Sequence, residues 1–127
     1  MKKIISLKLK LIALIVWALF IFFMSISKVT YPEGQGGSAF EVNNHVMAYF
    51  VLAALLFFVL KEFNVKAAYL ATALIAFFYG FGMEVIQAIL PWRSFSIYDS
   101  IFNLVGSFGV FILKPYYRFR PWNRQVI

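Results

Sequence analysis

Cysteine is absent from this chain of 127 residues. Its absence excludes disulfide bonds, zinc sites built from cysteine and catalysis by a thiol, and it leaves the redox compartment undetermined. Charged residues are scarce as well, at 13% of the chain against about a quarter in an average soluble domain. Hydrophobic residues make up 63%, and the mean hydropathy is +0.83. This balance excludes an ordinary soluble protein, and the length allows one domain.

Acidic residues are fewer than basic ones, five against twelve, and the net charge is +7. Such a surplus occurs in nucleic-acid-binding proteins, but its distribution here has a different meaning. Ten of the twelve Lys and Arg lie in the head 1–10, the turn 61–66 and the tail 114–127, and only Lys28 and Arg93 lie elsewhere. Cytoplasmic segments of membrane proteins carry such an excess. We therefore expect both termini in the cytoplasm, contact with anionic lipids, and no nucleic-acid partner.

Four hydrophobic segments follow one another along the chain, at about residues 9–27, 45–60, 67–90 and 97–114. Each is near the roughly 17–25 residues that an α-helix needs to cross a bilayer. We predict an all-α, polytopic membrane protein with one domain over residues 1–127, four transmembrane helices and a location in the cell membrane. The basic head before the first segment also resembles a signal peptide. We favour an uncleaved helix, because the apolar run is long and more spans follow, although the sequence alone leaves cleavage open.

A polar segment, residues 28–44, separates the first two predicted helices. It is long for a connection without regular structure, and long loops are often functional. At its end, Glu41 precedes His45 by four residues, which is about one helical turn. The two side chains could therefore pair at the mouth of the second helix.

Polar side chains are concentrated in an otherwise apolar stretch, residues 80–109. Glu84 and Gln87 share one face of the third predicted helix, and Asp99 and Asn103 share one face of the fourth. An acid at the centre of a membrane-spanning helix costs about 2.5–3.5 kcal/mol, so such residues are retained mainly for function. With both termini inside, Arg93, Asp99 and the outer end of the third predicted helix lie on the extracytoplasmic side. We predict that the polar side chains of this stretch converge there around an outward-opening pocket, with His45 near them: Glu84, Gln87, Arg93, Asp99 and Asn103.

The deeper polar residues also have structural interpretations. Glu84 could hold the bundle together through a bond between helices, although its depth and cost favour a functional role. Gln87 fits better as a structural residue that bonds a neighbouring helix or orients Glu84. Asn103 fits best as an interhelical hydrogen bond. Gly80 and Gly106 are small enough to form walls of the pocket.

The residues nearer the surface have alternative interpretations as well. Asp99 stands in the first turn of its helix, where a carboxylate can cap backbone N–H groups or take part in chemistry. Arg93 is an interfacial anchor, a partner for Asp99, or a bidentate ligand for a phosphate or carboxylate. His45 is either an ordinary interfacial histidine or a base oriented by Glu41.

Four short patterns occur in order along this part of the chain: Glu41-xxx-His45-xxx-Tyr49-Phe50, Tyr79-Gly80-xxx-Glu84-xx-Gln87, Pro91-x-Arg93-x-x-Ser96 and Asp99-xxx-Asn103-xx-Gly106. Together they resemble the VanZ-like family, small membrane proteins named for a member associated with resistance to glycopeptide antibiotics such as teicoplanin. The resemblance covers about residues 40–112. It implies a four-helix membrane domain linked, in some members, to the cell envelope, and it implies no particular molecular activity. Two features depart from the family pattern: Val42 stands where members often carry lysine, and the loop 28–39 has no counterpart.

Three classes of function remain. The first, which we favour, is an envelope protein whose outward-facing site recognises an anionic amphipathic ligand, such as a lipid-linked glycan. In this class Arg93 would bind the head group. The second is a small proton-coupled transporter that uses Glu84. The strong charge bias opposes it, because exporters that insert in both orientations need a weak bias. The third is a non-catalytic accessory bundle whose polar cluster only holds the helices together.

The candidate ligand-binding residues are the polar side chains of the three later helices and their connections: Glu41, His45, Glu84, Gln87, Arg93, Asp99 and Asn103. Whether the protein is an enzyme stays open; His45, Glu84 and Asp99 are the candidate acid–base groups. No cofactor is expected. A metal at those three residues is disfavoured, because one histidine and two carboxylates without a helix-borne ligand pair form a weak site. Expected partners are membrane lipids and an anionic lipid-linked or other envelope ligand. The ligand's identity and the oligomeric state, a homo-oligomer included, stay open.

Overall fold

The computed structural model describes residues 1–28 and 39–115, and within these ranges the chain is all-helical, as predicted. It forms four α-helices followed by one 3-10 helix: α1 (Lys2–Ile26), α2 (Ala39–Glu62), α3 (Ala68–Ile89), α4 (Ile97–Phe108) and η1 (Gly109–Leu113). No strand is present in the described ranges. Most of the predicted loop after residue 28 and the aromatic, basic tail from residue 116 onward lie outside the described residues.

Two helices begin earlier than the hydrophobic pattern predicts. Helix α1 begins at Lys2 rather than near residue 9, and α2 begins at Ala39 rather than at residue 45. Hydropathy marks the point where polarity changes, whereas a helix continues through polar residues as long as its backbone hydrogen bonds can form. The acid in the first turn of α2, Glu41, also suits the positive end of the helix dipole. As a consequence, Glu41 and His45 lie on one continuous helix.

The predicted polar turn between the second and third helices is present but shorter than expected. Helix α2 continues through Glu62, and two residues after it, Asn64 and Ala67, adopt the left-handed conformation with φ of 53°. The backbone N–H of Val65 donates to the carbonyl of Leu60 over 3.3 Å. This bond, with Asn64 in the left-handed conformation, closes the helix as a Schellman-type cap and reverses the chain within a few residues.

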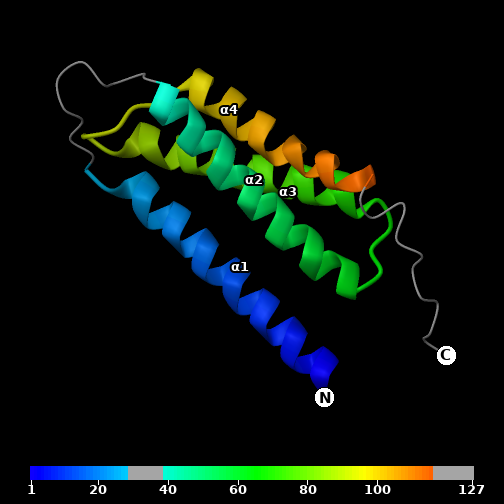
Figure 1. Ribbon diagram of the computed structural model, residues 1–127. Coiled ribbons are helices and arrows are strands. Elements are labelled where there is room, and N and C mark those ends of the chain that lie inside the picture. The colour runs from blue at the N-terminus through cyan, green and yellow to red at the C-terminus, as the bar shows by residue number, and fades with distance from the viewer. Residues whose placement is uncertain (29–38, 116–127) are drawn as a thin grey trace.

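Successive helices run in opposite directions (Figure 1). The end of α1, the start of α2, the end of α3 and the start of α4 therefore meet at one end of the bundle, and the start of α1 lies at the opposite end together with the end of η1. Helices α2, α3 and α4 pack on one another, whereas α1 lies against α2 and α3. Because the helix directions alternate, polar segments that are far apart in the sequence lie at the same end of the bundle.

Three helices of the described chain are long and apolar enough to cross a membrane: α1, residues Glu41–Glu62 of α2, and α3. The fourth apolar segment, Ile97–Leu113, is shorter because it consists of α4 continued by η1. At the usual rise per residue of α- and 3-10 helices its length is roughly 28 Å. That is close to the ~30 Å of a bilayer's hydrocarbon core.

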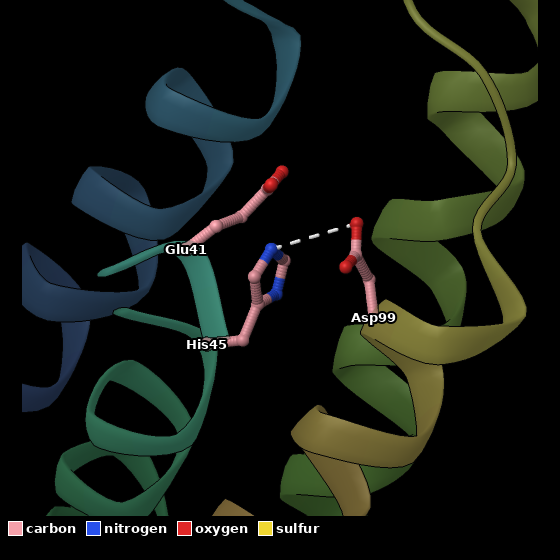
Figure 2. Close-up of side chains that lie close together, drawn as sticks. All are labelled: Glu41, His45 and Asp99. Atoms are coloured by element: carbon pink, nitrogen blue, oxygen red, sulfur yellow. Dashed lines mark ion pairs between the residues drawn. The ribbon is translucent and has the colours of Figure 1, made fainter. Parts of the chain in front are cut away.

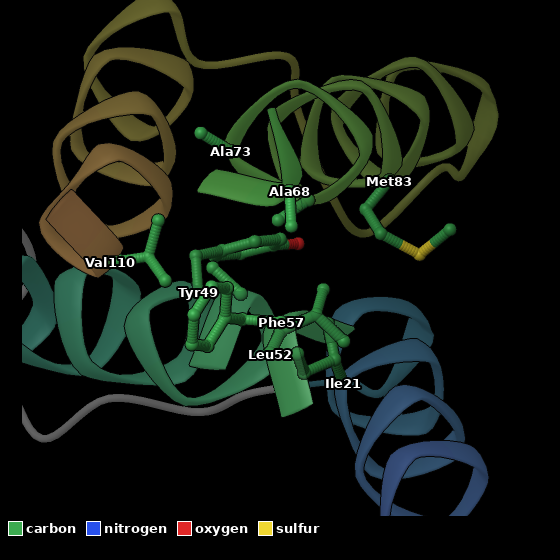
Figure 3. Packing of buried hydrophobic residues seen from close by; sticks show 10 residues of the cluster. Ile21, Tyr49, Leu52, Phe57, Ala68, Ala73, Met83 and Val110 are labelled. Atoms are coloured by element: carbon green, nitrogen blue, oxygen red, sulfur yellow. The ribbon is translucent and has the colours of Figure 1, made fainter. Parts of the chain in front are cut away.

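Small and aromatic residues share the core of the bundle (Figure 3). The ring of Phe57 is fully buried and stacks on Tyr69 with 4.4 Å between ring centroids. Ala53, Ala73 and Ala76 are also fully buried. Small residues at these positions let helix backbones approach, which is the main source of packing between membrane helices.

Helix α1 is attached to the bundle by polar bonds as well as by packing. The indole N–H of Trp17 donates to the carbonyl of Ala48 in α2 over 2.9 Å, and the hydroxyl of Tyr79 in α3 donates to the carbonyl of Ala18 over 2.6 Å. Lys10 forms an ion pair with Glu62 near the opposite end of the bundle from the polar stretch. The N-terminal helix is therefore an integral part of the fold.

Helices α4 and α2 approach each other closely at Gly106. A Cβ atom at this position would overlap the backbone carbonyl of Val46, which cannot move aside as a flexible side chain can. At Gly109, further along the same face, a Cβ atom would lie 2.9 Å from the ring of Phe50. Gly106 and Gly109 thus both lie against α2.

Gly106→Ala should destabilise the protein by about 1–3 kcal/mol, because α2 and α4 must separate to admit the methyl group. Gly82→Ala is the matched control: it places the same methyl group in a helix, but no atom lies within 4 Å of the added Cβ. The control should be neutral or stabilising by up to about 1 kcal/mol through helix propensity. Thermal unfolding of the detergent-purified proteins measures both, and equal stability of the two variants would contradict the close contact.

Candidate functional site

A pocket lies at the end of the bundle where the polar segments meet. Its volume is about 610 Å³, and its walls come from the start of α2, the end of α3, the connection to α4, and α4 itself. The polar wall residues are Glu41, Gln87, Arg93, Ser94, Ser96 and Asp99, and the aromatic ones are Trp92, Tyr98 and Phe102. Four of the seven predicted ligand-binding residues therefore line this pocket. The other three, His45, Glu84 and Asn103, lie beside or beneath it.

Glu84 is 1% exposed, and its carboxylate organises the start of α4. The backbone N–H of Ser96 donates to Oε2 of Glu84 over 3.2 Å, and the hydroxyl of Ser96 accepts the N–H of Asp99 over 3.2 Å. In a capping box, the acid in the first turn would accept the Ser96 N–H itself. Here Glu84, from α3, takes that place. The carboxylate of Asp99 therefore does not cap its own helix.

Asp99 instead faces His45 across the gap between α2 and α4 (Figure 2). Oδ2 of Asp99 lies 3.6 Å from Nε2 of His45. The other ring nitrogen, Nδ1, lies 2.8 Å from the amide oxygen of Asn103, which is fully buried. Because an amide oxygen only accepts, Nδ1 carries the hydrogen of this bond. Asn103 thus fixes the orientation of the imidazole, and Nε2 faces the carboxylate.

Glu41 completes this group from one turn before His45 on α2. One ligand atom from each of Glu41, His45 and Asp99 lies within 4.8 Å of the others, and all three residues are half-buried. The predicted proximity of Glu41 and His45 is present, and the ion pair of His45 is with Asp99. The carboxylate that pairs with Nε2 of His45 therefore comes from α4 and not from the neighbouring turn of α2.

Arg93 lies half-buried in the connection between α3 and α4 and lines the pocket. The ion pair considered between Arg93 and Asp99 is not present among the ion pairs of the described residues. The packing of α2 on α4 places His45 beside Asp99. Arg93 is only six residues before Asp99 in the sequence, but this proximity along the chain does not bring the two side chains together. Arg93 is left as the only cationic side chain on the described pocket wall, apart from any charge on neighbouring His45.

The structural interpretation of Gln87 agrees with its contacts. Its amide donates to the carbonyl of Ser25 over 3.0 Å, and the indole N–H of Trp92 donates to the carbonyl of Ile26 over 2.9 Å. Both bonds hold the end of α1 beside the pocket. Sequence reasoning missed Trp92 and the cap at Ser96, although signals existed: a tryptophan N–H at a membrane interface needs a partner, and Ser96-x-x-Asp99 is a capping pattern.

The two glycines expected in the pocket wall lie deeper. A Cβ atom at Gly80 would lie 2.7 Å from the ring of Tyr49 and 3.0 Å from the amide nitrogen of Asn103, and Gly106 meets the backbone of α2. Neither glycine lines the pocket. Close helix approach places them in the packed interior, so the wall consists of larger polar and aromatic side chains instead.

Substitutions at Glu84 separate its role as acceptor from its charge. Glu84→Gln keeps an oxygen for the N–H of Ser96, and we expect its stability to stay within about 1 kcal/mol of wild type. Glu84→Leu removes the acceptor and should destabilise by about 1.5–3 kcal/mol. Thermal unfolding in detergent measures both. A Gln variant as unstable as the Leu variant would show that the charge, not the hydrogen bond, stabilises this end of the bundle.

Comparisons of the chain with protein-family models, with curated proteins and with solved structures find no match. The resemblance to the VanZ-like family therefore stays a prediction from the motifs. What the chain can do chemically is argued from the geometry of the pocket itself.

Proposed function

We propose that the chain is a multi-pass protein of the cell membrane, similar to the VanZ-like family, whose pocket opens on the extracytoplasmic side and binds an anionic amphipathic ligand of the cell envelope. The single observation that supports this most is the composition of the pocket wall. It combines one arginine and several hydrogen-bonding side chains with three aromatic ones. Such a wall suits a ligand with a polar head and an apolar body.

The two parts of the wall would bind different parts of the ligand. Arg93 offers a planar fork of donors that matches phosphate or carboxylate oxygens, and Ser94 adds a hydroxyl beside it. Trp92 and Tyr98 are both exposed at the pocket, where ring faces can contact a sugar or the start of an acyl chain. Exposed tryptophan and tyrosine side chains are also typical of the headgroup region of a bilayer.

The proposed topology follows from charge and from the alternation of the helices. Ten of the twelve Lys and Arg belong to segments assigned to the cytoplasmic side. The start of α1 and the end of η1 lie at the same end of the bundle, as four crossings require. We infer that α1 is retained after insertion, because four hydrogen bonds join α1 to α2, to α3 and to the connection between α3 and α4. These bonds involve Trp17, Tyr79, Gln87 and Trp92.

The alternative functions have less support. In a proton-coupled transporter, Glu84 would have to reach a transport pathway, but it is buried and accepts the N–H of Ser96 rather than lining the pocket. An accessory bundle without a ligand accounts for Glu84, Gln87 and Asn103, all of which bond neighbouring elements. It gives no reason for an arginine and exposed aromatic side chains around a pocket.

Cysteine labelling tests the topology, since the chain has no cysteine of its own. A cysteine at Ser94 should react with a membrane-impermeant maleimide added to intact cells. Cysteines at Lys66 and Lys114 should react only after the membrane is opened. All three positions are exposed in the structure, so access depends on the membrane side alone. Labelling of Lys114→Cys from outside would show that the segment Ile97–Leu113 does not cross.

Arg93→Lys tests recognition against simple anchoring. Lysine keeps the positive charge and still reaches the headgroups, but it cannot form the bidentate hydrogen bonds of a guanidinium group. We expect binding of an anionic lipid-linked sugar by the purified protein to weaken by about tenfold or more, which corresponds to one charge-assisted hydrogen bond. Membrane insertion should be unchanged.

The matched control for this test is Lys66→Arg, which exchanges the same two residue types at the other end of the bundle. It should bind as wild type does. Equal affinity of Arg93→Lys and wild type for every anionic lipid that the wild type binds would mean that Arg93 is only an anchor. Loss of affinity in both variants would point to a general change of the protein–lipid interface instead.

A further inference from the structure

We propose that Glu41, His45 and Asp99 bind a divalent transition-metal cation, for which Zn²⁺ is the best match. The three residues come from the first two turns of α2 and the first turn of α4, and their ligand atoms lie within 4.8 Å of one another. One imidazole nitrogen and two carboxylate oxygens form a donor set that zinc accepts in proteins. Imidazole disfavours Mg²⁺ and Ca²⁺, which prefer oxygen ligands alone.

The spacing of the donors is close to that of a metal site. Two ligands of a tetrahedral zinc ion lie about 3.4 Å apart when each bond is about 2.0–2.1 Å long. Nε2 of His45 and Oδ2 of Asp99 are 3.6 Å apart, so this edge needs little adjustment. The Glu41 carboxylate is on a long side chain of the same helical face as His45, one turn away (Figure 2). One carboxylate oxygen of Glu41 lies within 4.8 Å of the other two ligand atoms, so the third ligand would need a modest shift of this side chain to reach the metal.

The hydrogen bond from His45 to Asn103 supports the same assignment. Metal-binding histidines usually donate the hydrogen of their other ring nitrogen to an oxygen acceptor, which orients the ring and fixes its tautomer. Here Nδ1 donates to the buried amide oxygen of Asn103 over 2.8 Å. The lone pair of a neutral Nε2 then faces the Asp99 carboxylate, and two such groups repel unless a proton or a cation lies between them. A metal ion resolves that conflict for Asp99 and Glu41 together.

The metal ion would also change the charge of the pocket. Two carboxylates, Glu41 and Asp99, and one cation, Arg93, line the wall, so its formal charge without a metal is −1. A divalent ion reverses it to +1. This consequence rests on the proposed function: an anionic head group would meet repulsion in the metal-free pocket and attraction in the metal-bound one. The metal site itself does not depend on that ligand.

The sequence groups His45 with Glu84 and Asp99, a set without a pair of ligands on one helix, and so disfavours a metal site. In the structure Glu84 is committed to the N–H of Ser96. Glu41 takes its place, and Glu41 with His45 forms a helix-borne pair at i, i+4 spacing on α2.

Calorimetric titration of the full-length protein with Zn²⁺ tests the site directly. The protein is purified in detergent through a tag without histidine, treated with EDTA, and titrated with Zn²⁺ and separately with Mg²⁺. We expect saturable binding of one Zn²⁺ per chain, weaker or no binding of Mg²⁺, and a higher midpoint of thermal unfolding with Zn²⁺. A folded wild-type protein that binds no Zn²⁺, or that binds Mg²⁺ more tightly, overturns the proposal.

Three variants locate the ion. Glu41→Gln and Asp99→Asn keep the side-chain shape but remove a charged ligand, and each should weaken Zn²⁺ binding by about tenfold or more. Glu62→Gln is the matched control, because it makes the same chemical change at the other end of α2. It should bind Zn²⁺ as wild type does. Circular dichroism confirms that the variants are folded, and equal Zn²⁺ affinity of Glu41→Gln and Glu62→Gln overturns the assignment.

A second titration separates the metal site from its effect on the ligand. The protein is titrated with short-chain phosphatidylglycerol, and with phosphatidylcholine as the uncharged-head comparison, each with and without Zn²⁺. Zn²⁺ should tighten phosphatidylglycerol binding by about tenfold for wild type and leave Glu41→Gln unchanged. Zn²⁺ binding without this effect overturns the link between metal and ligand. Failure of phosphatidylglycerol to bind with or without Zn²⁺ counts against the proposed function, while the calorimetric titration still decides the metal site.

Discussion

The hydrogen bond between the backbone N–H of Ser96 and the carboxylate of Glu84 determines the arrangement of the polar end of the bundle. It joins the end of α3 to the start of α4 at a buried position, where an unpaired N–H or carboxylate would be costly. It also takes over the bond that Asp99 would otherwise make in a capping box. The Asp99 carboxylate is then available to face α2, where it meets His45.

The close crossing of α2 and α4 supplies the second constraint. At Gly106 the backbones approach so closely that no side chain fits between them. This contact sets the register of α4 on α2, so that Asn103 and Asp99, one and two turns before Gly106, meet His45. Packing between membrane helices favours such small residues, because lipid offers no hydrophobic drive to bring helices together. The glycine therefore contributes to the site without lining it.

The pocket combines groups that are seldom adjacent in a membrane protein. Two half-buried carboxylates lie beside one arginine and one histidine, and aromatic side chains surround them. Both carboxylates stand in the first turn of a helix, where the dipole stabilises negative charge. The same ionised carboxylates are the form that binds a cation. The proposed metal ion and anionic head group would together balance the charges of this wall.

The sequence by itself determined the helical class, the approximate helices and the stretch that carries the polar residues, because hydrophobic runs and helical spacing are local properties. It misplaced the starts of α1 and α2, since hydropathy reports polarity rather than backbone hydrogen bonding. Only the tertiary structure decided the partners: Ser96 for Glu84, and His45 rather than Arg93 for Asp99. Carboxylates, amides and imidazoles can bond one another in many combinations, and the distances set by helix packing select among them.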